Sequence, residues 1–226
     1  MSVERTHGDQ DELIAPLADA GAVTVAVMVT SADGHATVGG HVGGLTGEAD
    51  QEVLLGVREL ADAVVVGATT VRVEGYEGLL DEPARARRRE RGLPEEPELI
   101  VATRMAGALP KGARAVTAPV DADGHPDFAP VWREIRAQHH GLIACEGGPT
   151  LLGQLLRLRL VDQLVLGISP MLVGGGDEKR LLDHTEELGL ALEVLAVRVA
   201  GDFVFVRYGA RGEATAAGQG ADHSGG

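Results

Sequence analysis

Short runs dominated by apolar and β-branched residues recur along the chain and alternate with amphipathic or glycine-rich segments. The runs cover residues 22–29, 63–66, 99–102, 114–117, 142–145 and 161–168. Apolar runs of this length, without regular alternation of polar residues, are typical of strands that are buried on both faces of a parallel sheet. The pattern therefore predicts a sheet with little surface open to solvent.

The segments between these runs carry helix signals. Val53, Val57 and Leu60 fall at helical spacing after Thr46, which we expect to cap this helix. Acidic residues in its first turn suit the positive end of the helix dipole. Further helices are predicted near residues 69–73, over 130–138, and from the Gly147-Gly148 pair to residue 158. Strands that alternate with helices in this way indicate an α/β fold of three layers, with helices on both faces of a mostly parallel sheet.

The end of the chain has a different pattern. Residues 191–199 and 202–208 flank Gly201-Asp202 and predict an antiparallel C-terminal hairpin at the edge of the sheet.

The chain divides into three parts by composition. Residues 21–210 are expected to form one domain, because 226 residues fit one α/β unit. Residues 1–20 are an acidic N-terminal extension, in which we expect 13–17 to pack as a short helix. Residues 211–226 offer almost nothing apolar to bury and are predicted to be a disordered tail.

Charge and composition exclude several classes of binding partner. The net charge of −14 disfavours nucleic acid, whose phosphates an acidic surface repels. A single cysteine, Cys145, cannot form a disulfide within the chain, and the eight histidines show no metal-ligand spacing, so no metal is predicted. The first residues lack the blocks of a signal peptide, and no apolar run is long enough to span a bilayer. We therefore expect a cytoplasmic protein with no membrane partner and a small-molecule substrate.

Two strand–glycine–helix turns are candidate anion sites. Gly67 and Thr70 follow the buried run 63–66, and Gly147-Gly148 follows the run 142–145. Glycine lets a ligand approach the backbone, and a helix N-terminus offers free N–H groups to a phosphate. Each motif alone is also consistent with an ordinary turn, and neither has the spacing of a Rossmann fingerprint. Together they favour one ligand lying across the strand ends.

Other strand ends carry polar side chains. Thr103-Arg104 could hold a nucleotide 2′-phosphate, since the guanidinium fork suits phosphate oxygens, or could be an exposed loop. Asp33, near the end of the first strand, is our candidate for moving a proton, with a simple Asp-Gly turn as the alternative. The arginine-rich segment 84–91 is either a solvated surface helix or loop, or a rim that attracts phosphates.

These motifs, in this order, resemble the riboflavin-biosynthesis pyrimidine reductase family. The resemblance runs from about residue 22 to 209. It rests on Thr30-Ser31-x-Asp33-Gly34, Gly43-Gly44-Leu45-Thr46-Gly47, Leu60-Ala61-Asp62-Ala63-Val64-Val65-Val66-Gly67-x-x-Thr70-Val71-Arg72-x-Glu74, Thr103-Arg104 with Leu109-Pro110, Glu146-Gly147-Gly148-Pro149-Thr150-Leu151, and Ile168-Ser169-Pro170-x-Leu172-x-Gly174. It implies a dihydrofolate-reductase-like fold, an NADPH-dependent oxidoreductase and a homodimer. The family reaction reduces 5-amino-6-(5-phosphoribosylamino)uracil by hydride transfer to the ribose C1 carbon.

The resemblance also implies roles for individual residues. The 2′-phosphate of NADPH would contact Thr103 and Arg104, and Asp33 remains the catalytic candidate. The remaining cofactor-binding residues would be Gly67, Thr70, Glu74, Glu146, Gly147, Gly148, Thr150 and Leu151, and the substrate-binding residues would be Ser31, Leu45, Thr46 and Gly47.

One departure from the family keeps alternatives open. The helix after Gly47 starts with Glu48 and Asp50, where pathway reductases often place an arginine, and an acidic start would repel the substrate phosphate. The chain could therefore reduce another pterin- or pyrimidine-like compound such as dihydrofolate, or bind a nucleotide without catalysis. The chain also lacks the zinc motif of the deaminase domain that is fused to the reductase in many bacteria. We therefore expect a stand-alone reductase.

Overall fold

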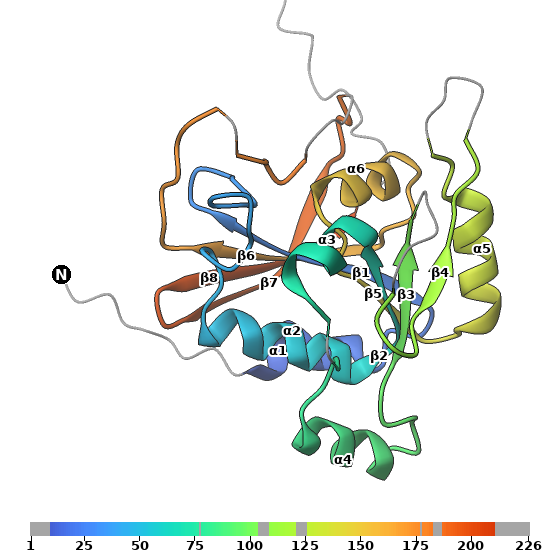
Figure 1. The fold of residues 1–226 in the computed structure, drawn as a ribbon. Coiled ribbons are helices and arrows are strands. Elements are labelled where there is room, and N and C mark those ends of the chain that lie inside the picture. The colour runs from blue at the N-terminus through green and yellow to red at the C-terminus, as the bar shows by residue number, and fades with distance from the viewer. Residues whose placement is uncertain are drawn as a thin grey trace, which may run out of the picture.

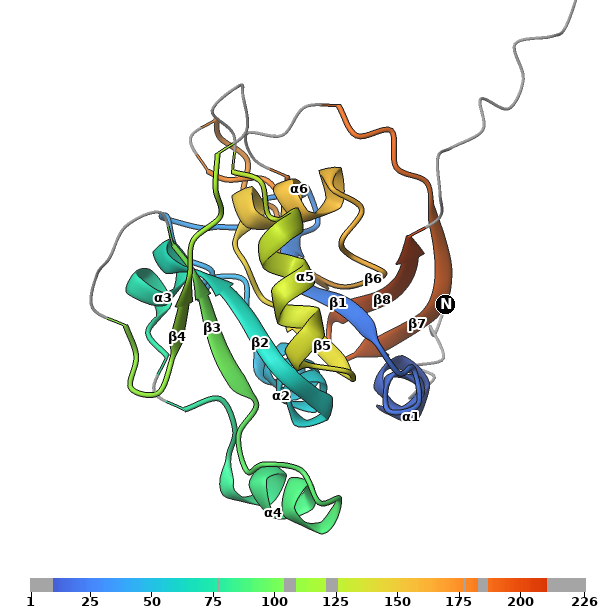
Figure 2. The same cartoon turned by 90° about the vertical axis from the view of Figure 1, so that its right-hand side faces the viewer.

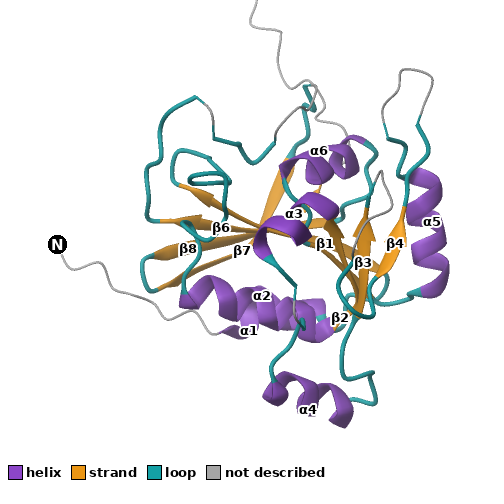
Figure 3. Ribbon diagram, in the orientation of Figure 1, coloured by secondary structure: helices purple, strands orange, loops and turns teal. Residues whose placement is uncertain are grey.

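The computed structural model describes residues 10–76, 78–103, 109–120, 126–176, 178–182 and 187–210, with side chains from residue 12. Within these residues the strands form one eight-stranded sheet in the order β4-β3-β2-β5-β1-β6-β8-β7. The strands are β1 (Val23–Ser31), β2 (Ala61–Gly67), β3 (Glu98–Ala102), β4 (Arg114–Val116), β5 (Leu142–Cys145), β6 (Gln163–Ser169), β7 (Leu192–Ala200) and β8 (Phe203–Ala210). Figures 1 and 3 show the strands crossing the middle of the molecule between the helices.

The helices lie on both faces of the sheet. They are α1 (Gln10–Ile14), α2 (Glu48–Leu60), α3 (Ala68–Glu74), α4 (Glu82–Glu90), α5 (Ala129–Gln138) and α6 (Pro149–Arg157), with a 3-10 turn at Ala15–Leu17. Apolar residues of α1, α2 and α3 pack in one core cluster with one face of the strands, and those of α5 and α6 pack in a second cluster on the other face. This arrangement confirms the three-layer α/β prediction.

The pairing of the strands confirms the predicted mixture of directions. The strands from β4 to β6 along the sheet are all parallel, whereas β8 runs antiparallel to both β6 and β7. The C-terminal hairpin therefore forms the edge of the sheet. The disordered tail predicted at 211–226 lies outside the described residues.

The N-terminal segment contributes to the core. Leu13 and Leu17 are fully buried in the cluster that also holds Val53 and Val57 of α2. The expected packing of residues 13–17 as a short helical segment is confirmed, since α1 and the 3-10 turn cover these residues.

The prediction that Thr46 caps α2 is wrong. Gly47 occupies the N-cap position in an extended conformation and makes no side-chain hydrogen bond to the helix. The Thr46 hydroxyl instead donates to the carbonyl of Gly43 at 3.3 Å. The Thr46 hydroxyl therefore forms its hydrogen bond within the glycine-rich loop. Thr46 also precedes the N-cap position by one residue.

The arginine-rich segment forms the surface helix α4, which lies off the sheet in Figure 2. Most of its arginines form ion pairs within the chain: Arg85 with Glu96 at 2.6 Å, Arg87 with Glu59 at 2.7 Å, and Arg89 with Glu82 at 2.8 Å and Glu95 at 3.0 Å. The positive charge of this helix is thus balanced locally, which supports the surface-helix interpretation over the phosphate rim.

Arg88 is the buried member of this helix. It donates to the carbonyl oxygens of Glu59 at 2.8 Å, Ala61 at 2.7 Å and Pro94 at 2.7 Å. Carbonyls at the end of a helix lack partners within the helix, so Arg88 satisfies groups at the junction of α2 and β2. Through Arg88, helix α4 is attached to the C-terminal end of α2.

Candidate active site

The carboxyl ends of five neighbouring strands meet at one edge of the sheet. β3, β2, β5, β1 and β6 are adjacent and parallel, but they do not all end at one level. Ala102 pairs with Gly67 and Ser31 pairs with Ser169, whereas Cys145 lies opposite Val65 and Ala26, so β1 and β6 run five residues beyond the end of β5. Ligands of open α/β sheets bind outside this edge. Most of the site residues predicted from the sequence lie at or just beyond the ends of these strands.

The two glycine turns predicted from the sequence are direct neighbours. Val65 of β2 lies opposite Cys145 of β5, and the N–H of Glu146 donates to the Val65 carbonyl at 2.9 Å. Thr70 Oγ1 lies between the turns, since it would be 3.2 Å from a Cβ at Gly148 and 3.9 Å from a Cβ at Gly67. The turns and the Thr70 hydroxyl therefore form one surface at the strand ends.

The second turn has room for glycine alone. A Cβ at Gly147 would lie 2.5 to 2.9 Å from side-chain atoms of Leu151, which is buried beneath the turn. Gly148 is the N-cap of α6 and makes no side-chain cap, so N–H groups in the first turn of the helix have no side-chain partner there. Thr150 is exposed in this first turn. The geometry fits a phosphate group held by backbone N–H groups.

The Glu146 side chain is engaged elsewhere. Its two carboxylate oxygens accept hydrogen bonds from Nε and Nη2 of Arg58, both at 2.6 Å, and from the Tyr76 hydroxyl at 3.1 Å. The Arg58 guanidinium also lies over the Tyr76 ring, 5.5 Å from its centroid. Burial, together with the Glu146 charge, raises the pKa of Tyr76. This buried cluster ties the second glycine turn to the last turn of α2.

Sequence reasoning missed Arg58 and Tyr76. Arg58 is 88 positions away from Glu146 and sits among ordinary helix residues. The sequence gives little indication that Arg58 belongs to the site. An arginine in the last turn of a helix is common, because its charge interacts favourably with the helix dipole.

The predicted 2′-phosphate site at Thr103-Arg104 is described only in part. Gly67 pairs with Ala102, so Thr103 follows directly beyond the end of β3, and its N–H donates to Val116 at 2.9 Å. Arg104 lies outside the described residues. Thr103 thus lies beside the first glycine turn.

Asp33 is held by several donors. Its carboxylate accepts hydrogen bonds from Ser31 Oγ at 2.5 Å and from the N–H groups of Val173 at 3.1 Å and Gly174 at 2.8 Å, and His35 Nδ1 lies 3.2 Å away. These hydrogen bonds, with that of Ser31 the largest contribution, lower the pKa of Asp33 well below its ordinary value. The carboxylate therefore anchors the segment after β6 to the end of β1.

The remaining predicted residues line the loop between β1 and α2. Glu74 accepts a hydrogen bond from the N–H of Val42 at 3.1 Å, which joins α3 to this loop. Leu45 is fully buried, while Thr46 and Gly47 are partly exposed. A Cβ at Gly47 would lie 3.1 Å from the Phe203 ring. The loop thus spans from α3 to the C-terminal hairpin.

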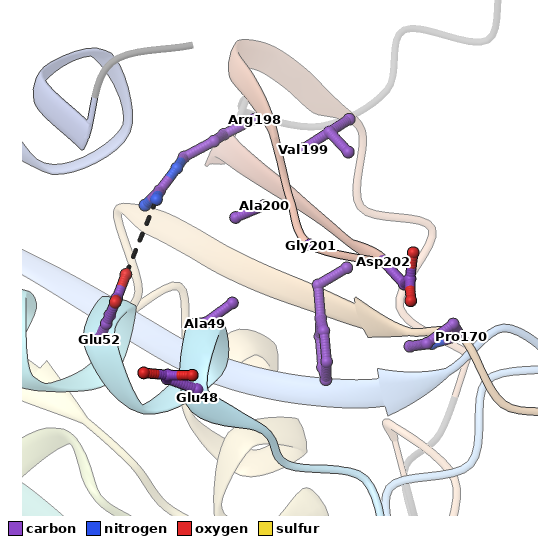
Figure 4. A pocket seen from close by; sticks show the side chains of 10 residues that line it. Glu48, Ala49, Glu52, Pro170, Arg198, Val199, Ala200, Gly201 and Asp202 are labelled. Carbon is purple, nitrogen blue, oxygen red and sulfur yellow. Dashed lines mark ion pairs between the residues drawn. The ribbon is translucent and has the colours of Figure 1, made fainter. Parts of the chain in front are cut away.

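A surface depression of about 480 Å³ lies between α2 and the C-terminal hairpin. Figure 4 shows Arg198 of β7 pointing toward Glu52 of α2, to which it is paired at 3.8 Å. Glu48, Ala49, Pro170 and residues 199–203 complete the lining. None of the predicted site residues that the structure describes lines this depression.

Two further findings concern metals and membranes. Among the described residues, no group of three or more His, Cys, Asp or Glu side chains could hold a metal ion. The helices described are all too short or too polar to cross a membrane.

Comparisons with known proteins agree with this arrangement. No curated protein sequence matches the chain. The structure resembles that of a pyrimidine reductase-like protein from Corynebacterium diphtheriae, with 23% identity, a TM-score of 0.72 and coverage of 84% of this chain and 92% of the other.

Two more distant structures share the fold. The riboflavin biosynthesis reductase Rib7 of Saccharomyces cerevisiae has 14% identity, a TM-score of 0.57 and coverage of 84% of this chain and 90% of the other. Dihydrofolate reductase of Enterococcus faecalis, complexed with NADP(H) and RAB-propyl, has 13% identity, a TM-score of 0.56 and coverage of 84% and 98%. The predicted dihydrofolate-reductase-like fold is thereby confirmed.

The family model of the RibD C-terminal domain matches residues 22–205. This match covers most of the chain and nearly the whole range over which the motifs resemble the pyrimidine reductases. It supports an oxidoreductase of the pyrimidine reductase type. The chain belongs to the RibD C-terminal domain family.

Proposed function

We propose that the protein is an NADPH-dependent reductase that acts on 5-amino-6-(5-phosphoribosylamino)uracil in the cytoplasm. The observation that carries the proposal is the junction of the two glycine turns at Thr70, where a Cβ at Gly148 would fill the space beside the hydroxyl. Membership of the RibD C-terminal domain family supports a reductase reaction at this surface. NADPH would supply the hydride.

The cofactor is proposed to lie across the ends of β3, β2 and β5. Backbone N–H groups of Gly148 and Thr150 would hold its pyrophosphate beside Gly147, with Gly67 and Thr70 on the neighbouring turn. Leu151 supports Gly147 from below, and Thr103 with Arg104 would meet the 2′-phosphate. Glu74 and Glu146 would act by holding the loop and the turn, because their carboxylates already accept hydrogen bonds from the protein.

The substrate is proposed to lie at the end of β1, against Ser31 and the loop of Leu45, Thr46 and Gly47. We propose that Asp33 positions this side of the site. A carboxylate that accepts three hydrogen bonds is held in its charged form, which makes it a poor proton donor near neutral pH. Its contacts support the anchoring of the segment after β6.

The homodimer is proposed to form through the C-terminal hairpin. β7 is the edge strand of the sheet, and Val194, Leu195, Val197 and Val199 on it are more than two-fifths exposed. An open strand edge with apolar side chains is a surface that proteins normally cover. A second copy of this strand would cover it.

A phosphate-free pyrimidine or pterin is the second candidate substrate. The observation that favours it is the start of α2, where Glu48 is exposed and Glu52 is close behind. These charges would repel a phosphate placed near them. Dihydrofolate is the test compound of this class.

The experiment is a titration with NADPH followed by an oxidation assay. NADPH fluorescence should change on binding, and the absorbance of the reduced nicotinamide should fall on addition of 5-amino-6-(5-phosphoribosylamino)uracil, or of dihydrofolate if the second candidate is right. In the variant Gly148→Val, side-chain bulk beside Thr70 should weaken NADPH binding at least tenfold, which corresponds to about 1.4 kcal/mol. The exposed Arg133→Ala on α5 is a control that should bind like the original protein. Absence of NADPH binding by the original protein would refute the proposal.

A further inference from the structure

A buried carboxyl group in the first turn of α2 has no partner among the residues that the structure describes. Asp50 is 8% exposed, and within the described part of the chain its carboxylate forms neither a hydrogen bond nor an ion pair. A buried carboxylate without a partner is costly, and native proteins rarely keep one without a functional reason. The group is therefore a candidate for contact with a ligand.

The sheet makes room for this carboxyl group. Gly167 of β6 lies beneath it, and a Cβ there would be 3.3 Å from Asp50 Oδ1 and 3.0 Å from the Phe205 ring. Gly167 is paired with Val29 on β1 and with Phe205 on β8. Glycine at this position leaves the space in which the Asp50 side chain lies.

The position of Asp50 is close to the proposed substrate side of the site. Ser31 and Ser169 are paired at the ends of β1 and β6, two residues beyond Val29 and Gly167, and therefore on the same face of the sheet. Both serines are buried. Asp50 thus lies over β6, two residues before the ends of the two paired strands. One of these strands, β1, ends at Ser31, the predicted substrate contact.

The other buried or anchored carboxylates near this edge are already engaged. Asp33 accepts hydrogen bonds from Ser31, Val173 and Gly174, and Glu146 is paired with Arg58. Of these three carboxyl groups at the strand ends, Asp50 alone is left to exchange a proton with a ligand.

The charged groups that face Asp50 are few. On its own helix they are Glu48 and Glu52, on β7 Arg198, which is paired with Glu52, and on β8 the buried Arg207. On the face toward α2, β1 and β6 present no charged side chain beside Gly167. In the described part of the chain, no cation is paired with the Asp50 carboxyl to hold it in its ionised form.

We propose that Asp50 is the proton donor of the reduction, an assignment that rests on the proposed function above. The hydride adds to C1 of the ribose, and the bond between C1 and the ring oxygen breaks with its electron pair left on that oxygen. The oxygen takes the proton of the Asp50 carboxyl, and the resulting carboxylate is reprotonated from water. The reaction needs one proton for each hydride, and this group supplies it.

The electrostatics of the site agree with this role. Burial raises the pKa of Asp50 to about 6, so about half of the carboxyl is protonated at pH 6 and about a tenth at pH 7. A general acid works best when its pKa is near the working pH.

The test is the pH dependence of kcat/KM for the pyrimidine in the original protein and in Asp50→Asn. In the original protein kcat/KM should fall about tenfold per pH unit above pH 6, and Asp50→Asn should lose about a hundredfold in kcat together with this decline. Glu48→Gln removes a charge from the same helix turn but from an exposed side chain, and it should keep the decline.

A second measurement needs no cofactor. The ¹³C signal of the Asp50 carboxyl, identified by its absence in Asp50→Asn, should titrate near pH 6 and move when the pyrimidine is added without NADPH. If Asp50→Asn does not fold, Asp50→Ser replaces it in both measurements.

The outcomes separate the two proposals. If the original protein oxidises NADPH with the pyrimidine but Asp50→Asn keeps its rate and its pH profile, or if the carboxyl signal does not respond to the pyrimidine, the assignment of Asp50 is overturned and the proposed function stands. If the original protein does not turn over the pyrimidine, both proposals are overturned.

Discussion

Glu146 and Asp50 are buried to the same extent but in opposite surroundings. Each is 8% exposed. Glu146 accepts hydrogen bonds from Arg58 and Tyr76, whereas Asp50 lies over Gly167 and has no partner in the described residues. Burial alone therefore does not decide what an acidic residue does. The partners make Glu146 a structural anchor and leave Asp50 able to exchange a proton.

Removing the cation from the Glu146 cluster should have the largest effect. Arg58→Ala leaves a buried carboxylate without its bidentate partner, so the free energy of unfolding should fall by about 3 to 5 kcal/mol. Urea denaturation at pH 7 measures this loss. The double variant Arg58→Ala, Glu146→Gln removes the uncompensated charge and should recover part of it. A double variant no more stable than Arg58→Ala would show that the carboxylate was not the source of the loss.

Neutralising Asp50 should have the opposite sign. The unfolded carboxyl has a pKa near 3.8, and the folded one is raised to about 6. The folded state binds its proton more tightly, so this group's contribution to stability is complete below about pH 4 and is lost as the pH rises through 6. Asp50→Asn should therefore be more stable than the original protein by up to about 3 kcal/mol at pH 8, and by little at pH 4.

Thermal unfolding at pH 4, 6 and 8 checks this difference. Glu48→Gln, which removes an exposed charge, should show no such pH-dependent gain. An equal gain for both variants would mean that general charge repulsion, rather than burial of Asp50, destabilises the protein at high pH.

The smallest effect is expected at Asp33, which extends the comparison to a carboxylate held by N–H and O–H donors. Asp33→Asn weakens the hydrogen bonds to Ser31, Val173 and Gly174 and should raise KM for the pyrimidine about tenfold. Its low pKa predicts that the pH profile between 5 and 8 keeps its shape. Steady-state measurements of kcat and KM between pH 5 and 8 test both expectations. Disappearance of the decline above pH 6 in this variant would return the proton-donor role to Asp33.

Much of the fold could be predicted from the chain because local signals and the tertiary structure agree. The apolar runs mark the strands, since a strand covered on both faces cannot carry polar residues at regular intervals. The junction of the two glycine turns also followed from the sequence, because each turn ends a strand and parallel strands end at one edge.

The rest depends on contacts between distant positions. Glu146 reads as a cofactor residue in its motif, but its partner Arg58 is 88 positions away. Asp50 has the sequence context of an ordinary acidic residue in a first helical turn, and the space for its side chain depends on Gly167, which lies 117 positions later on β6. The cap of α2 was misassigned because the Thr46 hydroxyl bonds within its own loop.

The length of α2 links these distant places. Its 13 residues extend about 20 Å at 1.5 Å per residue. At its far end Arg58 holds the second glycine turn through Glu146, and Arg88 of α4 donates hydrogen bonds to the carbonyls of Glu59 and Ala61. At its near end Asp50 lies over β6. The helix is thus a rigid rod clamped at one end, so a displacement of α4 would be transmitted along it to the carboxyl group that we propose delivers the proton.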